Sequence, residues 1–545
     1  MLSYPHQDPP ITPAKALLLA LLCAVWAGTG LIGHDPWKPD EDRAFGLIYH
    51  ILQSGDWLIP TLVGAPYMDK PPLFYMTAAV FSKLFSPLLA LHDGARLASG
   101  FYTALTLLFT GLAGRELFGK GRGWVAVIIL IGCLGLLVRA HQMIPDLALL
   151  TGCAMMLLGF ALSLRRALPA GILLGSGMGI GFMAKGFISP TLFLLIGVTL
   201  LLFRAWRTRS FLVSMGIALL FALPWLTIWP YLLYQRSPQL FMEWAWTLNI
   251  GLWLDFARGG SYFSGALYYL KILPWFAWPA LPLAAWGVWQ ARKKMLHEPE
   301  LQLLLVSFIV MLLALSLTPD IKDVFALPLL LPLVLLATAA LSSLRRGAAN
   351  ALDWFGIMTF GFFAILMWWG WAGLLQDNRS RITYWLKDYN PGFEPAFHAT
   401  PFWIALAATV LWVVLVWRVG RSMRRAVINW ASGVTLLWIL AMTLWLPWLD
   451  SSRSYRGMIA SLTEALPDTY DCIASRYLGD GQKAMLHYFG NIVAQPGNER
   501  SCGLLLTQGN LSRTDQKQGN WKVLWTGGRR GEQGERYYLY QQARP

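Results

Sequence analysis

The sequence predicts a polytopic α-helical membrane protein with a small, polar α+β domain at its C-terminus. Of its 545 residues, 56% are hydrophobic, and the mean hydropathy is +0.48. A soluble globular domain does not need so much apolar surface. Short basic clusters recur between the apolar runs, as they do in loops that orient membrane helices. The composition becomes polar and Gly-rich only from about residue 450 onward.

The basic clusters predict the orientation of the chain in the membrane. The formal net charge is +15, but its distribution in short loops between apolar runs argues against a nucleic-acid partner. The positive-inside rule puts all six clusters in the cytoplasm and connections such as residues 34–95, 141–146 and 318–323 on the outer side. The clusters are Arg115, Lys120 and Arg122; Arg165 and Arg166; Arg204, Arg207 and Arg209; Arg292, Lys293 and Lys294; Arg345 and Arg346; Arg418, Arg421, Arg424 and Arg425.

The apolar runs then give the number of spans. The first run, about residues 13–33, lacks a small-residue cleavage site, so we expect a retained first helix. Residues 73–91 are also apolar, but counting them as a span would reverse the side of every later cluster. Lys83 and Pro87 interrupt this run, so we expect a helix that lies in or dips into the outer interface. The next span is expected at about residues 96–114, and the total is 13 spans after a cytoplasmic N-terminus.

The polar tail is predicted to form a separate domain on the outer side. The predicted boundary divides the chain into residues 1–449, in the membrane, and residues 450–545. Short β-like runs in this tail, at residues 502–508, 521–526 and 536–541, indicate a small α+β domain. Cys472 and Cys502 could form a disulfide in an oxidising compartment, or pack as two thiols in a small core. The domain could bind an acceptor, or serve as a lid or a stability element.

Charged residues gather at the predicted outer helix ends. Ionisable groups beside apolar spans are costly to desolvate, so a shared polar cavity explains the set better than chance does. The alternative is a set of interfacial charges that reach to water. Lysines that face carboxylates suit a phosphate-bearing lipid, because a lysine can hold a phosphate oxygen while a carboxylate accepts a proton or stabilises an oxocarbenium-like sugar. The set is Asp40, Glu41, Asp42, Arg43, Asp69, Lys70, Asp146, Lys185 and Lys322.

The glycine-rich stretch GSGMGIGFMAKG, residues 175–186, is not expected to bind a nucleotide. It lies within a predicted span and follows no soluble strand, so the phosphate-loop interpretation is weak. We expect its glycines to allow two helices to approach closely.

Several ordered sequence blocks carry a resemblance to a known family. KPDEDR, residues 38–43, followed by ILQSGDWLIPTLVGAPYMDKPPLFY, residues 51–75, resembles the first outer loop of the GT-C lipid-linked sugar transferases. The resemblance is to the aminoarabinose (lipid A) transferases and their glycosyltransferase-39-like, protein mannosyltransferase-related relatives. It implies a GT-C catalytic domain over residues 1–449, with residues 34–95 as a first periplasmic loop that carries juxtamembrane helices. Further matching blocks are MIPDLAL from residue 143, GIGFMAKGF from residue 179 and SLTPDIKDVFALPLLLPL from residue 316.

The resemblance also implies roles for individual residues. Asp40 and Asp146 would be the catalytic acidic residues, and Lys70, Lys185 and Arg43 would bind the donor phosphate. Further cavity positions are Glu41, Asp69, Tyr67, Lys322 and Arg258.

The resemblance gives no firm reason to expect a cofactor. Asp69 stands where the family has a glutamate, and the outer loop at residues 245–265 lacks the histidines common in aminoarabinose transferases. A divalent metal is therefore not expected here, and Asp69 is only a weak candidate ligand.

The implied function is transfer of a sugar from a polyprenyl (undecaprenyl) phosphate donor at the periplasmic face of a bacterial inner membrane. The acceptor would be lipid A and the sugar 4-amino-4-deoxy-L-arabinose, although transfer of another sugar to a protein or polysaccharide hydroxyl is an open alternative. Two rivals belong to other classes, a lipid-linked sugar transporter or flippase and a membrane scaffold. A transporter should show paired repeats with charges near the bilayer midplane, whereas these charges gather on one face. The oligomeric state is left open.

Overall fold

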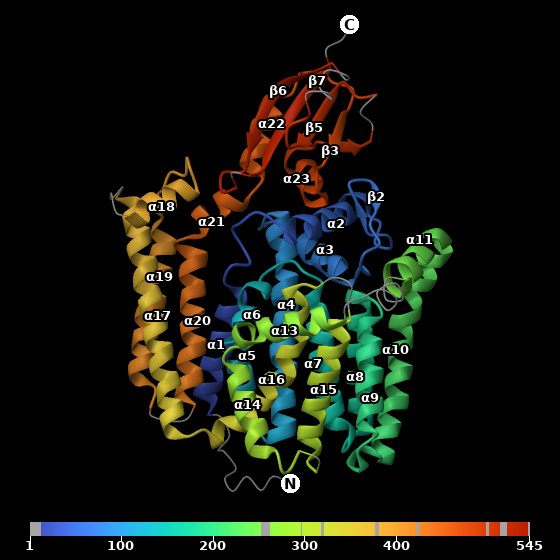
Figure 1. Cartoon of the computed structure of the whole chain (residues 1–545), viewed down its shortest axis with the longest axis vertical. Coiled ribbons are helices and arrows are strands. Elements are labelled where there is room, and N and C mark those ends of the chain that lie inside the picture. Colours follow the sequence, from blue (N-terminus) through green and yellow to red (C-terminus); the bar gives the residue numbers. More distant parts are fainter. Residues whose placement is uncertain are drawn as a thin grey trace.

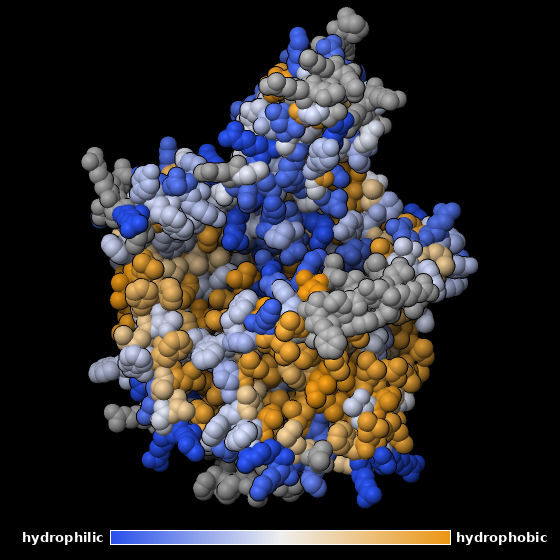
Figure 2. Space-filling view, in the orientation of Figure 1, coloured by the Kyte–Doolittle hydropathy of each residue, from blue (hydrophilic) through white to orange (hydrophobic). Residues whose placement is uncertain are grey.

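The computed structural model consists of a large helical part and a small domain that contains a sheet. In Figure 1 the helices fill the lower part of the molecule, and the small domain stands above them beside the C-terminus. Figure 2 shows an apolar band across this face of the helical part, as expected of a surface that faces lipid. The structure describes residues 12–251, 262–295, 297–317, 321–376, 381–420, 424–497, 501–512, 520–532 and 534–542.

Among the described residues, nine helices are long and apolar enough to cross a membrane. They are α4 (Leu91–Phe118), α7 (Asp146–Ser163), α8 (Ala167–Lys185), α10 (Arg209–Arg236), α15 (Pro299–Ser316), η3 (Asp323–Ala326) continued by α16 (Leu327–Ala340), α17 (Arg346–Leu375), α19 (Ala399–Arg418) and α20 (Arg425–Thr443). Shorter apolar helices are α1 (Pro13–Gly28), α3 (Leu73–Phe85) and α9 (Ile188–Leu200). The expected multi-pass membrane protein is confirmed, and the total of 13 spans stays a prediction.

Helix α3 falls in the segment that we expect at the outer interface. It has 13 residues and is about 20 Å long, which is too short to cross a hydrocarbon core of about 30 Å. Figure 1 shows α2 (Glu41–Ser54) and α3 at the upper ends of the long helices, below the small domain. Helix α4 begins at Leu91, somewhat before the predicted residue 96. The interfacial position of α3 stays a prediction.

Contacts place four of the six basic clusters at one end of the helices. Arg165 contacts Glu116 at 3.1 Å and Glu300 at 3.9 Å, which joins three loops. The guanidinium of Arg424 lies 5.2 Å from the centre of the Trp124 ring, a contact that adds a fourth loop to this group. The structure therefore agrees with the prediction that these clusters share one side.

Two apolar segments are each broken into two helices, and the breaks face each other. The backbone N–H of Leu134 donates to the carbonyl of Trp278 (3.3 Å), and the Trp430 indole donates to the carbonyl of Gly132 (2.9 Å). Such contacts satisfy backbone groups that a broken helix leaves open in an apolar environment. The pairs are α5 (Gly123–Ile131) with α6 (Leu134–Arg139), and α13 (Tyr262–Phe276) with α14 (Ala280–Ala291).

Short elements connect the long helices. They are β1 (Thr61–Leu62), β2 (Ala65–Pro66), η1 (Arg204–Trp206), α11 (Pro238–Met242), η2 (Glu243–Gly251), η4 (Leu341–Ser343), α18 (Arg381–Tyr389) and α21 (Leu446–Arg453). Helix α21 crosses the predicted domain boundary at residue 450, so the change in composition falls inside a helix.

The C-terminal domain, defined here as α22, α23 and strands β3 to β7, is a mixed sheet with two helices. The strand order is β4-β3-β5-β7-β6, with β3 parallel to β4 and β5, and β7 antiparallel to β5 and β6. The three predicted β-like runs correspond to β5, β6 and β7, while the shorter β3 and β4 carry no comparable pattern. The elements are α22 (Arg456–Glu464), β3 (Ile473–Arg476), α23 (Asp480–Gly490), β4 (Ala494–Pro496), β5 (Leu504–Gln508), β6 (Trp521–Gly528) and β7 (Arg536–Gln542).

Of the two cysteine states that the sequence allows, the structure has the disulfide. Cys472 is bonded to Cys502 across a sequence separation of 30 residues. The bond joins the segment before β3 to the segment before β5, two neighbouring parallel strands of the sheet. It therefore links these two strands covalently at the ends where they begin.

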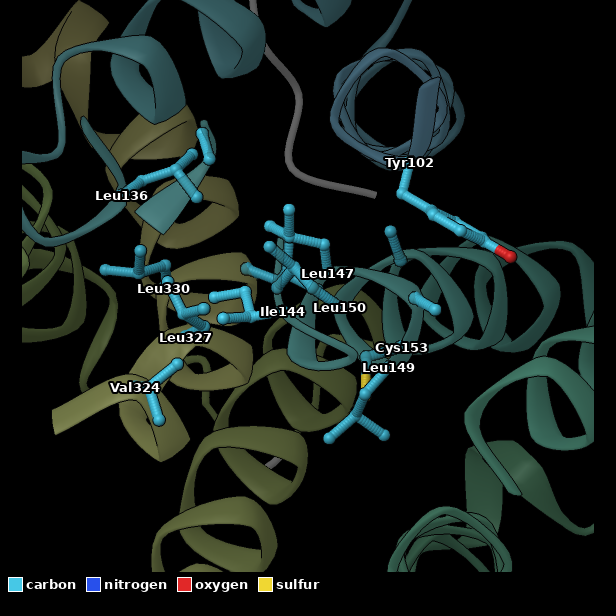
Figure 3. Packing of buried hydrophobic residues seen from close by; sticks show 14 of the residues in the cluster. Tyr102, Leu136, Ile144, Leu147, Leu149, Leu150, Cys153, Val324, Leu327 and Leu330 are labelled. Atoms are coloured by element: carbon cyan, nitrogen blue, oxygen red, sulfur yellow. The ribbon is translucent and has the colours of Figure 1, made fainter. Parts of the chain in front are cut away.

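Buried apolar side chains from α6, α7 and α16 meet in the helical core. Figure 3 shows Leu136, Ile144, Leu147 and Leu330 in this cluster, and each is at most 3% exposed. Ile144 and Leu147 lie on either side of Asp146 in the sequence. Because close-packed interiors allow little movement, this packing fixes the start of α7 and with it the position of Asp146.

Candidate functional site

The segment between α1 and α2 brings Asp40 to the end of α6. Asp40 directly precedes α2, but its carboxylate does not cap that helix. Oδ1 lies 3.7 Å from Nη2 of Arg43, and Oδ2 lies 3.6 Å from Nη1 of Arg139. The Asp40 side chain is 28% exposed. Its carboxylate therefore lies between two guanidinium groups, without a hydrogen bond to either, and is partly exposed.

Arg139 is a site residue that the sequence patterns above do not single out. Its guanidinium donates to both carboxylate oxygens of Asp323, at 3.0 and 2.9 Å, and to Oε1 of Gln142 at 2.8 Å. It thereby links Asp40 to the segment before α16. A signal for it exists in the sequence, because Arg139 is a basic residue at the end of the helix opposite to the basic clusters.

Asp146 and Lys185 form a tight ion pair. Oδ1 of Asp146 lies 2.7 Å from Nζ of Lys185, and the two side chains are only 6% and 9% exposed. Asp146 begins α7 and Lys185 ends α8, positions at which the helix dipoles favour an acid and a base, respectively. The ammonium also lies 3.8 Å from the centre of the Phe325 ring, a cation–π contact. Two residues from different sequence blocks, 39 positions apart in the chain, are thus in direct contact.

Glycines allow α7 and α8 to approach closely. A Cβ added to Gly177 would lie 2.7 Å from the carbonyl oxygen of Gly152, and a Cβ on Gly152 would overlap the carbonyl of Gly177. The structure therefore confirms the helix-packing interpretation of the glycine-rich stretch. This close approach also sets the distance between Asp146 and Lys185.

The segment between α2 and α3 adds Tyr67, Asp69 and Lys70. Nη1 of Arg43 donates to the Tyr67 hydroxyl at 3.2 Å, and burial raises the pKa of that hydroxyl. Nζ of Lys70 lies 3.8 Å from Oδ2 of Asp69. Lys70 and Asp69 are also close enough to Lys185 for their charges to act on it. The two lysines therefore belong to one electrostatic environment.

Glu41, predicted to share this cavity, lies elsewhere. Its side chain is buried, and Oε1 accepts hydrogen bonds from Nε of Arg96 (2.9 Å) and the backbone N–H of Met143 (3.1 Å). Oε2 accepts from the backbone N–H of Trp37 at 3.1 Å. The contacts with Arg96 and Met143 hold the first loop to the helical core and the one with Trp37 holds the loop to itself, so the cavity assignment is corrected to a structural one.

Two further predicted positions lie at the edge of the described site. Lys322 is exposed, and its carbonyl accepts a hydrogen bond from the Tyr269 hydroxyl at 3.4 Å. It directly precedes Asp323, the partner of Arg139. Arg258 lies outside the described residues.

The side chains of the site offer charge stabilisation and proton transfer. Paired cations can stabilise an anionic leaving group, and a carboxylate can accept a proton. Within the described ranges, no three histidine, cysteine or carboxylate side chains form a group that could hold a metal ion, and Asp69 contacts Lys70. The charged residues brought together are Asp40, Asp69, Asp146, Asp323, Arg43, Lys70, Arg139 and Lys185.

Comparison with known sequences finds a family model and several transferases that are similar to this chain. Residues 69–229 match the family model described as dolichyl-phosphate-mannose-protein mannosyltransferase. An undecaprenyl phosphate-alpha-4-amino-4-deoxy-L-arabinose arabinosyl transferase of Pseudomonas paraeruginosa is 29% identical over 61% of this chain and 60% of its own length. One from Pseudomonas savastanoi pv. phaseolicola is 27% identical over 78% of this chain and 76% of its own length. The match thus spans about three fifths of the first relative and three quarters of the second.

Comparison with solved structures finds the same fold. The crystal structure of ArnT from Cupriavidus metallidurans bound to undecaprenyl phosphate has a TM-score of 0.69 and 17% identity, over 98% of this chain and 99% of that one. The apo structure of the same protein has a TM-score of 0.66, over 97% of both chains. The ordered sequence blocks, the sequence relatives and the fold agree. The chain is therefore similar in sequence to the aminoarabinose transferases and shares the fold of ArnT.

Proposed function

We propose that this protein is a glycosyltransferase that moves one sugar from a polyprenyl phosphate donor to an acceptor. The observation that carries the proposal is the convergence of Asp40 and Arg139 with the Asp146–Lys185 pair and Lys70 at the ends of apolar helices. A lipid-linked phosphate needs such a site, with cations for its head group beside an apolar surface for its chain. The names of the relatives include undecaprenyl phosphate, which supports the same donor for this protein.

The reaction is a displacement at the anomeric carbon, in which the bond to the lipid phosphate breaks. Lys70 and Arg43 lie 3.8 and 3.7 Å from their acidic partners, which is beyond hydrogen-bond distance, so they can turn toward the leaving phosphate. Lys185 is already in tight contact with Asp146 at 2.7 Å and adds its charge from a fixed position. Together these cations balance the charge that develops on the leaving group.

Asp40 is the carboxylate nearest to the reaction. When the acceptor is a hydroxyl, Asp40 takes its proton as the bond to the sugar forms. When the acceptor is a phosphate, no proton has to be removed, and Asp40 orients the substrate or stabilises positive charge on the sugar. Asp146, the second acidic residue, holds Lys185 beside the donor phosphate.

The proposal includes the acceptor and the cellular position. Lipid A is the proposed acceptor and 4-amino-4-deoxy-L-arabinose the proposed sugar, since the relatives are arabinosyl transferases. The topology has 13 spans in a bacterial inner membrane, with residues 1–449 as the catalytic domain. The active site and the C-terminal domain, residues 450–545, face the periplasm. The basic clusters at the opposite end of the helices support this orientation.

Substitution of the lysines tests the proposal. Lys70→Met should weaken binding of undecaprenyl phosphate in detergent micelles, and the double variant with Lys185→Met should abolish it. Lys83→Met is the matched control, because this exposed lysine lies on α3 and makes none of the site contacts given above. Asp40→Asn should abolish sugar transfer while the melting temperature stays unchanged. Undiminished lipid binding by the double variant would favour a scaffold over an enzyme.

A further inference from the structure

The C-terminal domain contacts the chain on both sides of Asp40. Before Asp40, the Arg456 guanidinium donates to both carboxylate oxygens of Asp35, at 2.9 and 2.5 Å. The ammonium of Lys38 pairs with Glu535. These partners lie more than 400 residues apart in the sequence, so the contacts exist only because the C-terminal domain docks on the first loop.

Helix α23 holds the chain after Asp40. Phe45 of α2 packs edge-to-face on Tyr488, with 4.7 Å between ring centres. Gly46 faces Ala484 so closely that a Cβ on this glycine would overlap the alanine methyl. Close-packed contacts of this kind fix the separation of the two helices.

Asp42 completes this contact. Its side chain is buried, and a Cβ on Gly481, in the first turn of α23, would overlap its carboxylate. Desolvation raises the pKa of Asp42 to about 7, as expected of an acid that a neighbouring element closes off from water. Asp42 is two residues from Asp40.

The side-chain contacts of Asp40 are too long to fix its position. Its carboxylate makes no hydrogen bond to the start of α2, and its two ion contacts are 3.6 and 3.7 Å long. The backbone on either side therefore decides where the carboxylate points. That backbone is held by Arg456 and Glu535 on one side and by α23 on the other.

We propose that the C-terminal domain is a positioning element of the active site, and that Gly481 and Glu535 act on the reaction through the placement of Asp40. This inference rests on the proposed function, which makes Asp40 the reaction-centre carboxylate. It assigns the domain a part in the chemical step itself, distinct from binding of the acceptor. Gly481 and Glu535 are positioning residues, because neither touches the reacting atoms.

The first test compares two helical glycines. G481A adds a methyl group against Asp42, whereas alanine suits a helix better than glycine does, so α23 itself should keep its fold. G457A is the matched control, because its Cβ in α22 would meet no atom of the described chain within 4 Å. In G481A we expect faster backbone hydrogen exchange over residues 35–46 and a kcat about 10- to 100-fold lower. The KM for the undecaprenyl phosphate sugar should not change, and G457A should match the wild type.

Removal of the overlapping group should restore the enzyme. The double variant D42A/G481A leaves room for the new methyl group, so we expect hydrogen exchange and kcat to return toward the values of D42A alone. Such a rescue separates a displaced Asp40 from general damage to the domain. A kcat of the double variant that stays well below that of D42A alone would overturn the proposal.

A second perturbation acts on the other side of Asp40. K38M removes the ion pair with Glu535, which keeps Arg529 as a partner at 2.8 Å, so the C-terminal domain stays intact. We expect a several-fold fall in kcat, with K38R close to the wild type. K522M is the control, since Lys522 is an exposed lysine on β6 of the same domain.

The two proposals fail in different ways. A wild-type kcat in both G481A and K38M would overturn the positioning role, while sugar transfer by the wild type and its loss in D40N would still support the proposed function. Full activity of D40N would instead overturn the role of Asp40 in the reaction. The hydrogen-exchange comparison would then still report whether the domain holds residues 35–46, because it needs no substrate.

Discussion

Two neighbouring carboxylates should respond in opposite ways to the same chemical change. Glu41→Gln should destabilise the fold, whereas Asp40→Asn should leave stability unchanged and remove activity. Glu41 is fully buried and accepts hydrogen bonds from Arg96 and from two backbone N–H groups. Asp40 is 28% exposed, and its ion contacts are longer than hydrogen bonds. One carboxylate therefore supports the fold, and the other is accessible at the candidate site.

The expected loss of folding stability depends on the groups that each substitution leaves unpaired. Breaking a buried ion pair by removing one charge costs about 3–5 kcal/mol, because the other charge stays buried. Arg96 keeps Asp93 as a partner at 3.0 Å, so we expect about 3 kcal/mol for Glu41→Gln. A partly exposed pair with long contacts contributes less than about 1 kcal/mol, which is the limit we expect for Asp40→Asn.

The pH dependence gives a second signature of the same difference. Burial by itself would raise the pKa of Glu41, but the Arg96 charge outweighs it and holds the pKa below its ordinary value of 4.5. A depressed pKa means that the stabilisation is present above about pH 4.5 and is lost as the pH falls further. The stability difference between the wild type and Glu41→Gln should therefore be full at neutral pH and shrink in acid.

The assay is intrinsic tryptophan fluorescence during heating in detergent micelles, together with sugar transfer at a temperature where both variants are folded. We expect a lower melting temperature for Glu41→Gln, with transfer per folded molecule retained, because glutamine loses the charge but keeps the side-chain shape and an accepting oxygen, so the turn at Asp40 does not shift. Asp40→Asn should melt like the wild type and transfer no sugar. A wild-type melting temperature for Glu41→Gln would refute the reasoning, because the buried pair would then contribute nothing to stability.

Three other substitutions test separate parts of the structure. Arg139→Gln should lower transfer roughly tenfold or more, measured as kcat, because Asp40 loses one of its two cationic neighbours. Cys472→Ser opens a disulfide with a 30-residue separation and should cost about 3–4 kcal/mol in unfolding of the C-terminal domain, with alkylation and mass spectrometry checking the bond in the wild type. Gly152→Ala should push α7 from α8 and lower stability by about 1–3 kcal/mol in a melting experiment, whereas Gly197→Ala, with room for a Cβ, should not.

The features that could be predicted from the sequence are those that depend on short-range pattern. Hydropathy identified helices long and apolar enough to cross a membrane, and the contacts among four of the six basic clusters agree with their predicted placement at one end. The glycines of residues 175–186 were interpreted correctly because small residues have one main use inside an apolar helix. For the two tail cysteines the sequence left a disulfide and two packed thiols open, and the structure has the disulfide.

Other features depend on geometry that no local pattern contains. Arg139 reaches Asp40 only because an apolar segment is broken between α5 and α6, and that break is satisfied by backbone groups and a tryptophan from distant segments. Glu41 was placed in the cavity because it adjoins Asp40, but its partner Arg96 lies 55 residues away on another helix. Strands β3 and β4 have only four and three residues, too few to show an alternation.

The start of α2 explains why three consecutive acidic residues have three different surroundings. Successive side chains on an α-helix point about 100° apart, so Asp40, Glu41 and Asp42 cannot share one partner. Asp40 faces the candidate site, Glu41 pairs with the helical core, and Asp42 packs on the C-terminal domain. A rotation or shift of this one turn would change all three contacts together. The core and the C-terminal domain therefore both act on the orientation of Asp40, and a change in either is transmitted to the candidate site over a distance of one helical turn.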